Sequence, residues 1–404
     1  MAIWKIHGSH GDRDLNINLN GKDLIVTGIN GSGKTFFLKE LFQTAKNHVE
    51  TNQPSLSTLE EQLAAIVIPS QNSGISRVSA AQQESERLKA LIESLKRRII
   101  IEIPEQEVLR RSYWTRKSVV LFFQAARASN IRRPTGAAGI DVIKEQQQKT
   151  APDKYVSDSL EEHLVNLKNR HALAIVHDKN QPLADALDKW IRDFESNLSE
   201  LMEDASAKLV FNSSHLKFTI TRDNLPTTDF QNLSSGYSAI FAVYAELLVR
   251  TAYFEVSPNE MRGIVIIDEL DAHLHVSLQR MILPFLKTSF PLIQFIVSTH
   301  SPFIITSVKD AVIYDVGRNE VIDDDISMYS YSSVMEGLLG TPPTSRVLEK
   351  TIEELALETH RQPPNTHFLH QLISKLEPSS AMLDVTSRAY FEAARLKLSD
   401  MSEE

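Results

Sequence analysis

Residues 23–35 read DLIVTGINGSGKT, and this stretch decides the fold. Residues 24–26 are consecutive aliphatic side chains, which is typical of a strand buried on both faces. The segment GINGSGKT at 28–35 is rich in glycine, which lets the backbone turn sharply. Apolar side chains then recur at helical spacing at Phe36, Phe37, Leu38, Leu41 and Phe42. The stretch therefore predicts a strand, a glycine-rich loop and a helix, in that order.

The loop at 28–35 fits the pattern GxxxxGK[ST], which is a phosphate-binding pattern. Its glycines allow several backbone N–H groups to point at one phosphate, and the following helix adds the positive end of its dipole. Lys34 is expected to reach the β- and γ-phosphates, and Thr35 to ligate Mg²⁺. We therefore expect ATP and Mg²⁺ as cofactors. The predicted nucleotide contacts are Asn30, Gly31, Ser32, Gly33, Lys34 and Thr35.

Two further buried strands end in polar residues. The strand in RGIVIIDEL at 262–270 ends in Asp268, which can hold the Mg²⁺ shell, and Glu269, which can act as general base towards water. The strand in QFIVSTHSP at 294–302 leads to His300, whose neutral imidazole could bridge the γ-phosphate and the catalytic carboxylate. A strand that ends in an ordinary polar turn, and a histidine that caps a loop, are the alternatives.

Strands that alternate with helices and end in polar motifs predict an α/β fold with a mostly parallel sheet flanked by helices. Ligands bind at the carboxyl ends of such strands. Two short segments, at 2–7 and 14–19, predict an antiparallel N-terminal β subdomain. We also expect a strand at 118–123, a mobile loop at 129–153, a hairpin at 208–221, and helices at 80–98, 157–169, 183–204 and 239–253.

These elements predict three regions. Residues 1–50 and 205–330 are expected to form the ATPase head. Residues 51–204 are expected to be an insertion, with a core strand at 118–124 and a helical, basic segment. Residues 331–404 are expected to form a helical C-terminal region.

Composition excludes several functional classes. The 404 residues include no cysteine, which excludes disulfides, thiolate catalysis and zinc–thiolate sites and favours a reducing cytoplasm. No apolar run approaches the length of a membrane span, and the first residues lack a signal-peptide pattern. The net charge of −9 argues against nucleic-acid binding over the whole surface. Residues 77–133 carry 13 Lys/Arg against 6 Asp/Glu, which fits either a phosphate-binding patch or a solvated helical face.

Five segments stand in one order along the chain: GINGSGKT, LSSGY, IVIIDE, LDAHLH and STHSP. This order resembles the soluble ABC ATPases, the branch that includes SMC proteins, RecF and the OLD-type ATPases. The last two segments are similar to ATPases of prokaryotic antiphage systems such as Septu, PARIS and retron-associated operons. The resemblance covers about residues 1–50 and 205–330.

The resemblance implies roles for single residues. It makes 233–237 the signature motif, in which Ser234 and Gly236 contact phosphate, and it places Asp271 in the D-loop. Ser235 and Tyr237 depart from the family's usual LSGGQ. The resemblance also gives Asp268 to magnesium, Glu269 to general base catalysis and His300 to the switch position.

One further role falls on a glutamine. Gln124, at the end of the strand at 118–123, resembles the glutamine that contacts the metal and the nucleotide in the family. Gln71 is the alternative for this role.

The resemblance also implies an assembly. In the family the signature motif contacts ATP held by a second subunit, so two heads enclose two nucleotides. We therefore expect a homodimer or larger homo-oligomer. The expected role is a cytoplasmic ATPase of an antiphage system that controls a separately encoded effector such as a nuclease. The alternative is a RecF- or SMC-like ATPase of DNA repair that contacts DNA through 77–133.

Overall fold

The computed structural model describes residues 2–11, 13–51, 56–66, 75–96, 98–136 and 139–403. By its internal contacts the chain divides into two compact units, Met1–Tyr331 and Ser332–Glu404. Each unit has its own hydrophobic core, and the candidate site lies entirely in the first.

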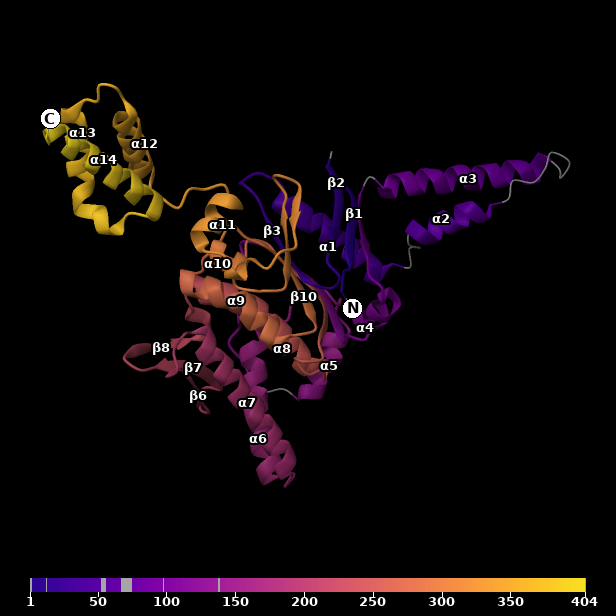
Figure 1. Ribbon diagram of the computed structural model, residues 1–404. Coiled ribbons are helices and arrows are strands. Elements are labelled where there is room, and N and C mark those ends of the chain that lie inside the picture. The colour runs from indigo at the N-terminus through magenta and orange to yellow at the C-terminus, as the bar shows by residue number, and fades with distance from the viewer. Residues whose placement is uncertain are drawn as a thin grey trace. The chain divides into compact units, whose positions relative to one another are not determined.

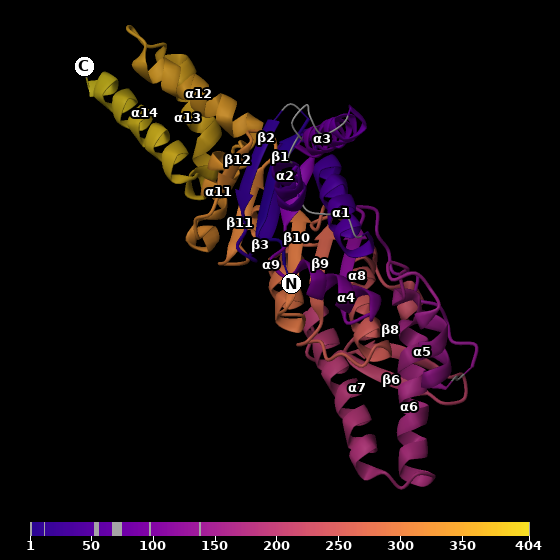
Figure 2. The same ribbon diagram turned by 90° about the vertical axis from the view of Figure 1, so that its right-hand side faces the viewer.

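A six-stranded sheet forms the centre of the first unit. Its strand order is β12 (Glu320–Ile322), β11 (Ala311–Asp315), β3 (Asp23–Thr27), β10 (Ile293–Ser298), β9 (Arg262–Ile267) and β5 (Ser118–Phe123). Neighbouring strands are parallel except for β12, which runs antiparallel to β11. Every residue of β3, β5, β10 and β11 is buried, as expected for strands covered on both faces. Figure 2 shows β12, β11, β3, β10 and β9 side by side.

Helices cover both faces of this sheet. On one face α1 (Lys34–Glu50) and α4 (Gln106–Trp114) share a core with β3, β5, β9 and β10. The other helices that flank the central sheet are α8 (Ser235–Tyr253), α9 (Val276–Ser289) and the short α10 (Pro302–Ile305). Most residues of α8 are buried around its whole circumference, which is the pattern of a helix packed within the protein.

A second, antiparallel sheet lies over α1. Its order is β2 (Arg13–Asn18), β1 (Lys5–His10) and β4 (Ile99–Glu102). The expected N-terminal β subdomain is therefore present, and its strands lie at 5–10 and 13–18 instead of 2–7 and 14–19. Residues 51–204 contribute β4 to this sheet and β5 to the central one, because strand pairing joins segments that are distant in the sequence. The predicted fold class is confirmed.

The remaining elements of the first unit are two helix pairs and a small sheet. Helices α2 (Leu56–Ala65) and α3 (Ile75–Lys96) pack on each other, as do α6 (Leu160–Val176) and α7 (Gln181–Leu201), and both pairs extend away from the central sheet (Figure 1). The small sheet is an antiparallel meander of β6 (Lys208–Asn212), β7 (Lys217–Arg222) and β8 (Leu225–Asp229). The predicted hairpin is thus extended by a third strand.

The segment expected to be a loop at 129–153 contains a helix, α5 (Ile140–Gln148). Its Ile143 is buried, and the helix contacts α8. Burial of one apolar side chain against a neighbouring helix outweighs the loop-forming glycines and prolines on either side.

The second unit contains α12 (Arg346–His360), α13 (Thr366–Leu376) and α14 (Val385–Glu403), and α11 (Tyr331–Gly337) begins at the last residue of the first unit. The three longer helices share a small core that includes Leu355, Leu369 and Phe391. Among the described helices, none combines the length and the hydropathy that crossing a membrane requires.

Candidate functional site

The glycine-rich loop connects β3 to the N-terminus of α1. Gly31 and Gly33 have φ of 79° and 100°, values that favour glycine, and Gly33 is the N-cap of α1. Lys34 is buried, and its Nζ donates to the carbonyl oxygens of Gly28 at 2.9 Å and Ile29 at 3.2 Å. Lys34 thus folds back over the loop. Burial lowers the pKa of Lys34, whereas the nearby carboxylates, led by Glu269, raise it.

A hydroxyl and a carboxylate meet beside this loop. The Oγ1 of Thr35, at the start of α1, donates to Oδ2 of Asp268, at the end of β9, over 2.8 Å. The other carboxylate oxygen, Oδ1, accepts from the hydroxyl of Ser298 at 2.6 Å. Because β3, β10 and β9 are parallel neighbours, their carboxyl ends bring all three side chains to one edge of the sheet.

The turn after β9 carries the next two acids. Glu269 has a left-handed backbone with φ of 47°, and its N–H donates to the Oγ of Ser298 at 2.7 Å. Asp271 accepts from the hydroxyl of Thr299 at 2.6 Å. The residue after Thr299 is His300, which is half-buried. Burial, and to a lesser degree Lys34, lowers the pKa of His300, and Asp271 and Glu269 oppose this shift. The net shift favours the neutral form of the imidazole.

The N-terminus of α8 is open to solvent. Ser234 is its N-cap, is exposed, and makes no side-chain capping bond within the described residues. Gly236 is buried, and a Cβ built on it would lie 2.9 Å from the carbonyl oxygen of His273. The start of α8 therefore packs closely on the turn that follows Asp271. The hydroxyl of Tyr237 points away from this end and donates to the carbonyl of Met202 at 3.3 Å.

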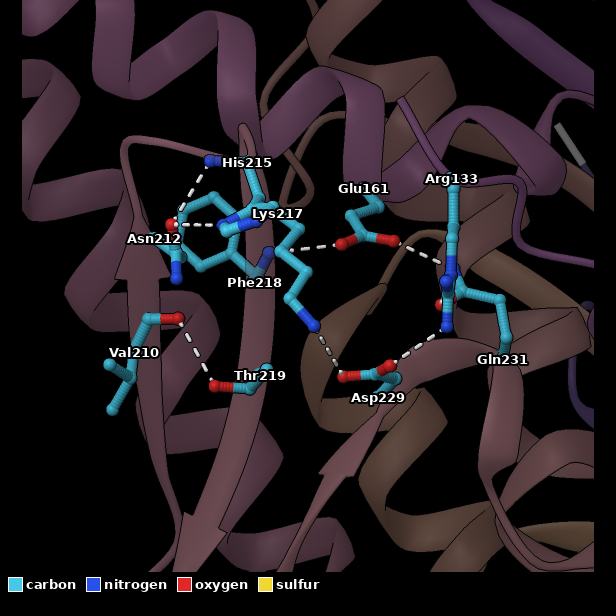
Figure 3. Close-up of polar contacts among 10 residues, drawn as sticks. All are labelled: Arg133, Glu161, Val210, Asn212, His215, Lys217, Phe218, Thr219, Asp229 and Gln231. Carbon is cyan, nitrogen blue, oxygen red and sulfur yellow. Dashed lines mark hydrogen bonds and ion pairs between the residues drawn. The ribbon is translucent and has the colours of Figure 1, made fainter. Parts of the chain in front are cut away.

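A partly buried polar network around Glu161 anchors the chain just before Ser234 (Figure 3). The carboxylate of Glu161 on α6 accepts from the backbone N–H of Phe218 at 2.9 Å and from Nε2 of Gln231 at 2.7 Å. Asp229, at the end of β8, accepts from Arg133 at 3.0 Å. These bonds tie the small sheet, α6 and the segment at 131–133 to the entrance of α8.

Gln124 follows β5 directly and is exposed. Strands β10 and β9 lie between β5 and β3, so Gln124 is at the same edge of the sheet as the loop. The alternative, Gln71, lies outside the described residues. Three side chains that the sequence did not single out also belong to this edge: Ser298, Thr299 and Arg127. Ser298 is the last residue of the buried strand β10 and Thr299 follows it, and these positions could have marked them.

The fold and this set of residues define the class of P-loop nucleotide-binding proteins. A strand leads through the glycine loop to a helix, and a lysine, a hydroxyl and two acids converge at the loop. Within this class, the chain belongs to the family described as "AAA domain, putative AbiEii toxin, Type IV TA system", whose model matches residues 24–306.

The chain is also similar to probable ATPases of retrons and to a Septu protein. It is 33% identical over 117 residues to the Retron Vc95 probable ATPase of Vibrio cholerae serotype O1 biovar El Tor, covering 28% of this chain and 23% of that protein. It is 31% identical over 137 residues to the Retron Ec83 probable ATPase of Escherichia coli, covering 33% and 25%. It is 37% identical over 95 residues to Septu protein PtuA of Bacillus mycoides (strain KBAB4), covering 22% and 13%. The matches thus span a quarter or less of each relative.

The solved structures that the chain matches include an SMC head bound to the C-winged helix domain of ScpA. That structure is 11% identical with a TM-score of 0.40, covering 82% of this chain and all of that one. The CbiO1 protein of Clostridium perfringens, part of an ABC transporter complex, is 12% identical with a TM-score of 0.34, covering 84% and 97%.

Proposed function

We propose that this chain binds and hydrolyses ATP, with the P-loop residues Asn30–Thr35 holding the phosphates and Glu269 as general base towards water. The observation that carries this proposal is the 2.8 Å contact between Thr35 and Asp268 beside the glycine loop. Neutral His300 accepts or donates one hydrogen bond near the γ-phosphate. Lys34 leaves the carbonyls of Gly28 and Ile29 when the phosphates arrive, because these offer it a stronger, charged acceptor.

The oxygen atoms at this edge suit Mg²⁺. Mg²⁺ in nucleotide sites takes one or two protein oxygen ligands, substrate phosphates and water. Thr35 and Asp268 supply a hydroxyl and a carboxylate in contact with each other. Among the described residues no group of three or more His, Cys, Asp or Glu side chains could hold a metal ion. The proposed Mg²⁺ site therefore uses phosphate oxygens as further ligands. When bound, Mg²⁺ neutralises phosphate charge, and Thr35, Asp268 and Gln124 would hold it.

The exposed N-terminus of α8 supports a site shared between two copies of the chain. Within the described part of the chain the hydroxyl of Ser234 makes no capping bond, and it lies at the positive end of a 19-residue helix, which favours an anion. We propose that Ser234 and Gly236 contact the γ-phosphate held by the P-loop of a second copy, and that Asp271 lies at the same contact. Two copies would then enclose two nucleotides.

A mixing experiment tests the shared site. Lys34→Ala and Ser234→Arg are each expected to abolish hydrolysis, because each removes one half of every site. When the two variants are mixed in equal amounts, half of the dimers contain one intact site, so about a quarter of the parent activity returns. Absence of recovery, with both variants folded and able to exchange subunits, contradicts sharing. An unchanged rate in Glu269→Gln contradicts the assignment of the base.

The wider role that we propose is the sensor or scaffold subunit of an antiphage system that controls a separate effector such as a nuclease. The support is the similarity to two retron probable ATPases and to Septu protein PtuA over part of their length. The C-terminal unit is the proposed holder of the effector, because it exposes large apolar side chains at Leu357, Val385 and Leu396. Co-purification with the product of the adjacent gene tests this role. A chain that purifies without that product, and whose gene gives no protection against phage, contradicts it.

The alternative, a RecF- or SMC-like ATPase that grips DNA through 77–133, has weaker support. Several arginines of this stretch already pair with carboxylates of the chain: Arg87 with Glu84, Arg110 with Glu107, Arg132 with Asp158 and Arg133 with Asp229. DNA binding that weakens steeply with salt would favour this alternative.

A further inference from the structure

The segment that follows Gln124 runs along the turn that carries the catalytic acids. From this segment Arg127 directs its guanidinium to the backbone of that turn. Its Nη1 donates to the carbonyl oxygen of Asp268 at 2.8 Å, and its Nη2 to that of Leu270 at 3.0 Å. Both nitrogens lie 3.3 Å from the carbonyl oxygen of Glu269. One side chain thus holds three consecutive carbonyl groups.

The N–H groups of the same turn are bonded to Ser298 of the neighbouring strand β10. The N–H of Glu269 donates to Oγ of Ser298, and the N–H of Leu270 donates to its carbonyl oxygen at 2.8 Å. Ser298 therefore fixes the donors of the turn, whereas Arg127 fixes its acceptors. These bonds matter because Glu269 has φ of 47°, a left-handed conformation that is unfavourable for a residue with a side chain.

The guanidinium also remains charged where it lies. Burial lowers the pKa of Arg127 to about 10, and the carboxylates of Asp271, Asp268 and Glu269 act in the opposite direction. At neutral pH the guanidinium group is therefore positively charged and lies near the three carboxylates. A neutral side chain of similar length could not reproduce these charge-assisted bonds.

Two residues after Arg127, the same segment contacts helix α8. The N–H of Ser129 donates to the carbonyl oxygen of Ser238 at 3.1 Å and to its Oγ at 3.0 Å. Ser238 lies one helical turn after Ser234, whose carbonyl accepts from it at 2.8 Å. Residues 127–129 therefore join the turn at 268–270 to the N-terminus of α8.

We infer that Arg127 is a positioning residue, which holds Glu269 in its working conformation and links that conformation to the N-terminus of α8. This inference rests on the proposed function, since it takes Glu269 as the base. Arg127 contacts the backbone carbonyl oxygen of Asp268, whereas Thr35 contacts the carboxylate of Asp268. It acts through the backbone of the turn.

The test separates ATP binding from turnover in the full-length chain. In Arg127→Lys the charge remains, but the primary amine cannot reach three carbonyls in the planar fork of a guanidinium. We expect kcat to fall about 100-fold, because a base displaced by even 1 Å loses about that much. The KM for ATP and the Kd for MgATP are expected to stay within about threefold of the parent values, since the phosphate loop is untouched. Arg132→Lys, an exposed arginine in the same segment, is the matched control and should keep the parent rate.

A rescue experiment gives a second readout that a general loss of stability would not produce. In Arg127→Ala, free guanidinium ion, at concentrations that leave the parent folded, should restore part of kcat, and urea should not. A parent-like kcat in both Arg127 variants overturns the inference, as does loss of MgATP binding in folded Arg127→Lys. These results remain distinct from failure of the proposed function, which would appear as parent-like hydrolysis in Glu269→Gln.

Discussion

The hydroxyl of Thr35 donates to Asp268 over 2.8 Å, although 232 residues separate the two positions in the chain. The bond joins the first turn of the P-loop helix to the end of a strand two places away in the sheet. It brings together two oxygen atoms of the kind that Mg²⁺ prefers as ligands.

The first prediction concerns this pair. Asp268→Asn keeps the shape of the side chain but removes its negative charge, so Mg²⁺ loses an anionic oxygen nearby. We expect ATP hydrolysis to fall at least about 100-fold, because the charge on the transferred phosphate is no longer balanced. Titration of Mg²⁺ against hydrolysis measures the effect. Asp324→Asn, an exposed acid remote from the loop in the sequence, is the control and should leave the titration unchanged.

The second prediction concerns the close contact between α8 and the turn after Asp271. In Gly236→Ala the new methyl group would lie 2.9 Å from the carbonyl oxygen of His273, so the start of α8 must shift. We expect hydrolysis to drop about tenfold or more, while MgATP binding to the P-loop is retained. At Gly136 a methyl group meets nothing within 4 Å among the described atoms, so Gly136→Ala serves as control. Equal rates in both variants would remove the proposed role of this contact.

The third prediction is a pH dependence that arises from His300. Burial and Lys34 lower its pKa, so the neutral ring persists below the pH at which an exposed histidine takes up a proton. If the neutral ring is the working form, kcat should fall as the pH drops through this lowered pKa and stay level above it. The profile of kcat against pH, in the parent and in His300→Gln, measures this. The variant should be slower by about 100-fold and should lack the step attributed to His300. A step of the same size and position in the variant rules out His300 as its source.

The fourth prediction concerns stability. His163 on α6 is fully buried beside Trp190 and Tyr253, and within the described residues neither ring nitrogen has a hydrogen-bond partner. Burial lowers its pKa to about 4. Between pH 6.5 and pH 4, His163 therefore takes up a proton in the unfolded chain but stays neutral in the folded chain. The free energy of unfolding falls as the pH falls through this range.

The size of this effect can be measured by denaturant unfolding at two pH values. Between pH 7 and pH 5 the lowered pKa of His163 should cost about 2 kcal/mol of unfolding free energy. In His163→Phe the side chain cannot take up a proton. The loss of unfolding free energy between pH 7 and pH 5 should therefore be about 2 kcal/mol smaller in this variant than in the parent. His177→Gln removes an exposed histidine and should behave like the parent. The same pH response in all three proteins would show that His163 does not control it.

Much of the fold was predictable because its signals are local. The buried strands at 23–27, 118–123 and 262–267 are apolar runs, and they form where predicted. The helix in 129–153 was missed, because its stability depends on burying Ile143 against α8, and periodicity within that short segment does not reveal the partner. The third strand of the small sheet was missed for a similar reason, since its residues LPTTD are mostly polar and exposed.

By itself, the sequence determined the glycine loop, the helix that follows it and the acids at the end of β9, because backbone freedom and apolar periodicity are properties of neighbouring residues. Tertiary structure decided which of these groups touch. The contact of Thr35 with Asp268 depends on the order of parallel strands, and β4 reaches β1 across almost a hundred residues. The contacts of Arg127, on which its proposed role rests, have no sequence signature, because they are made to backbone carbonyls, which every residue carries whatever its side chain.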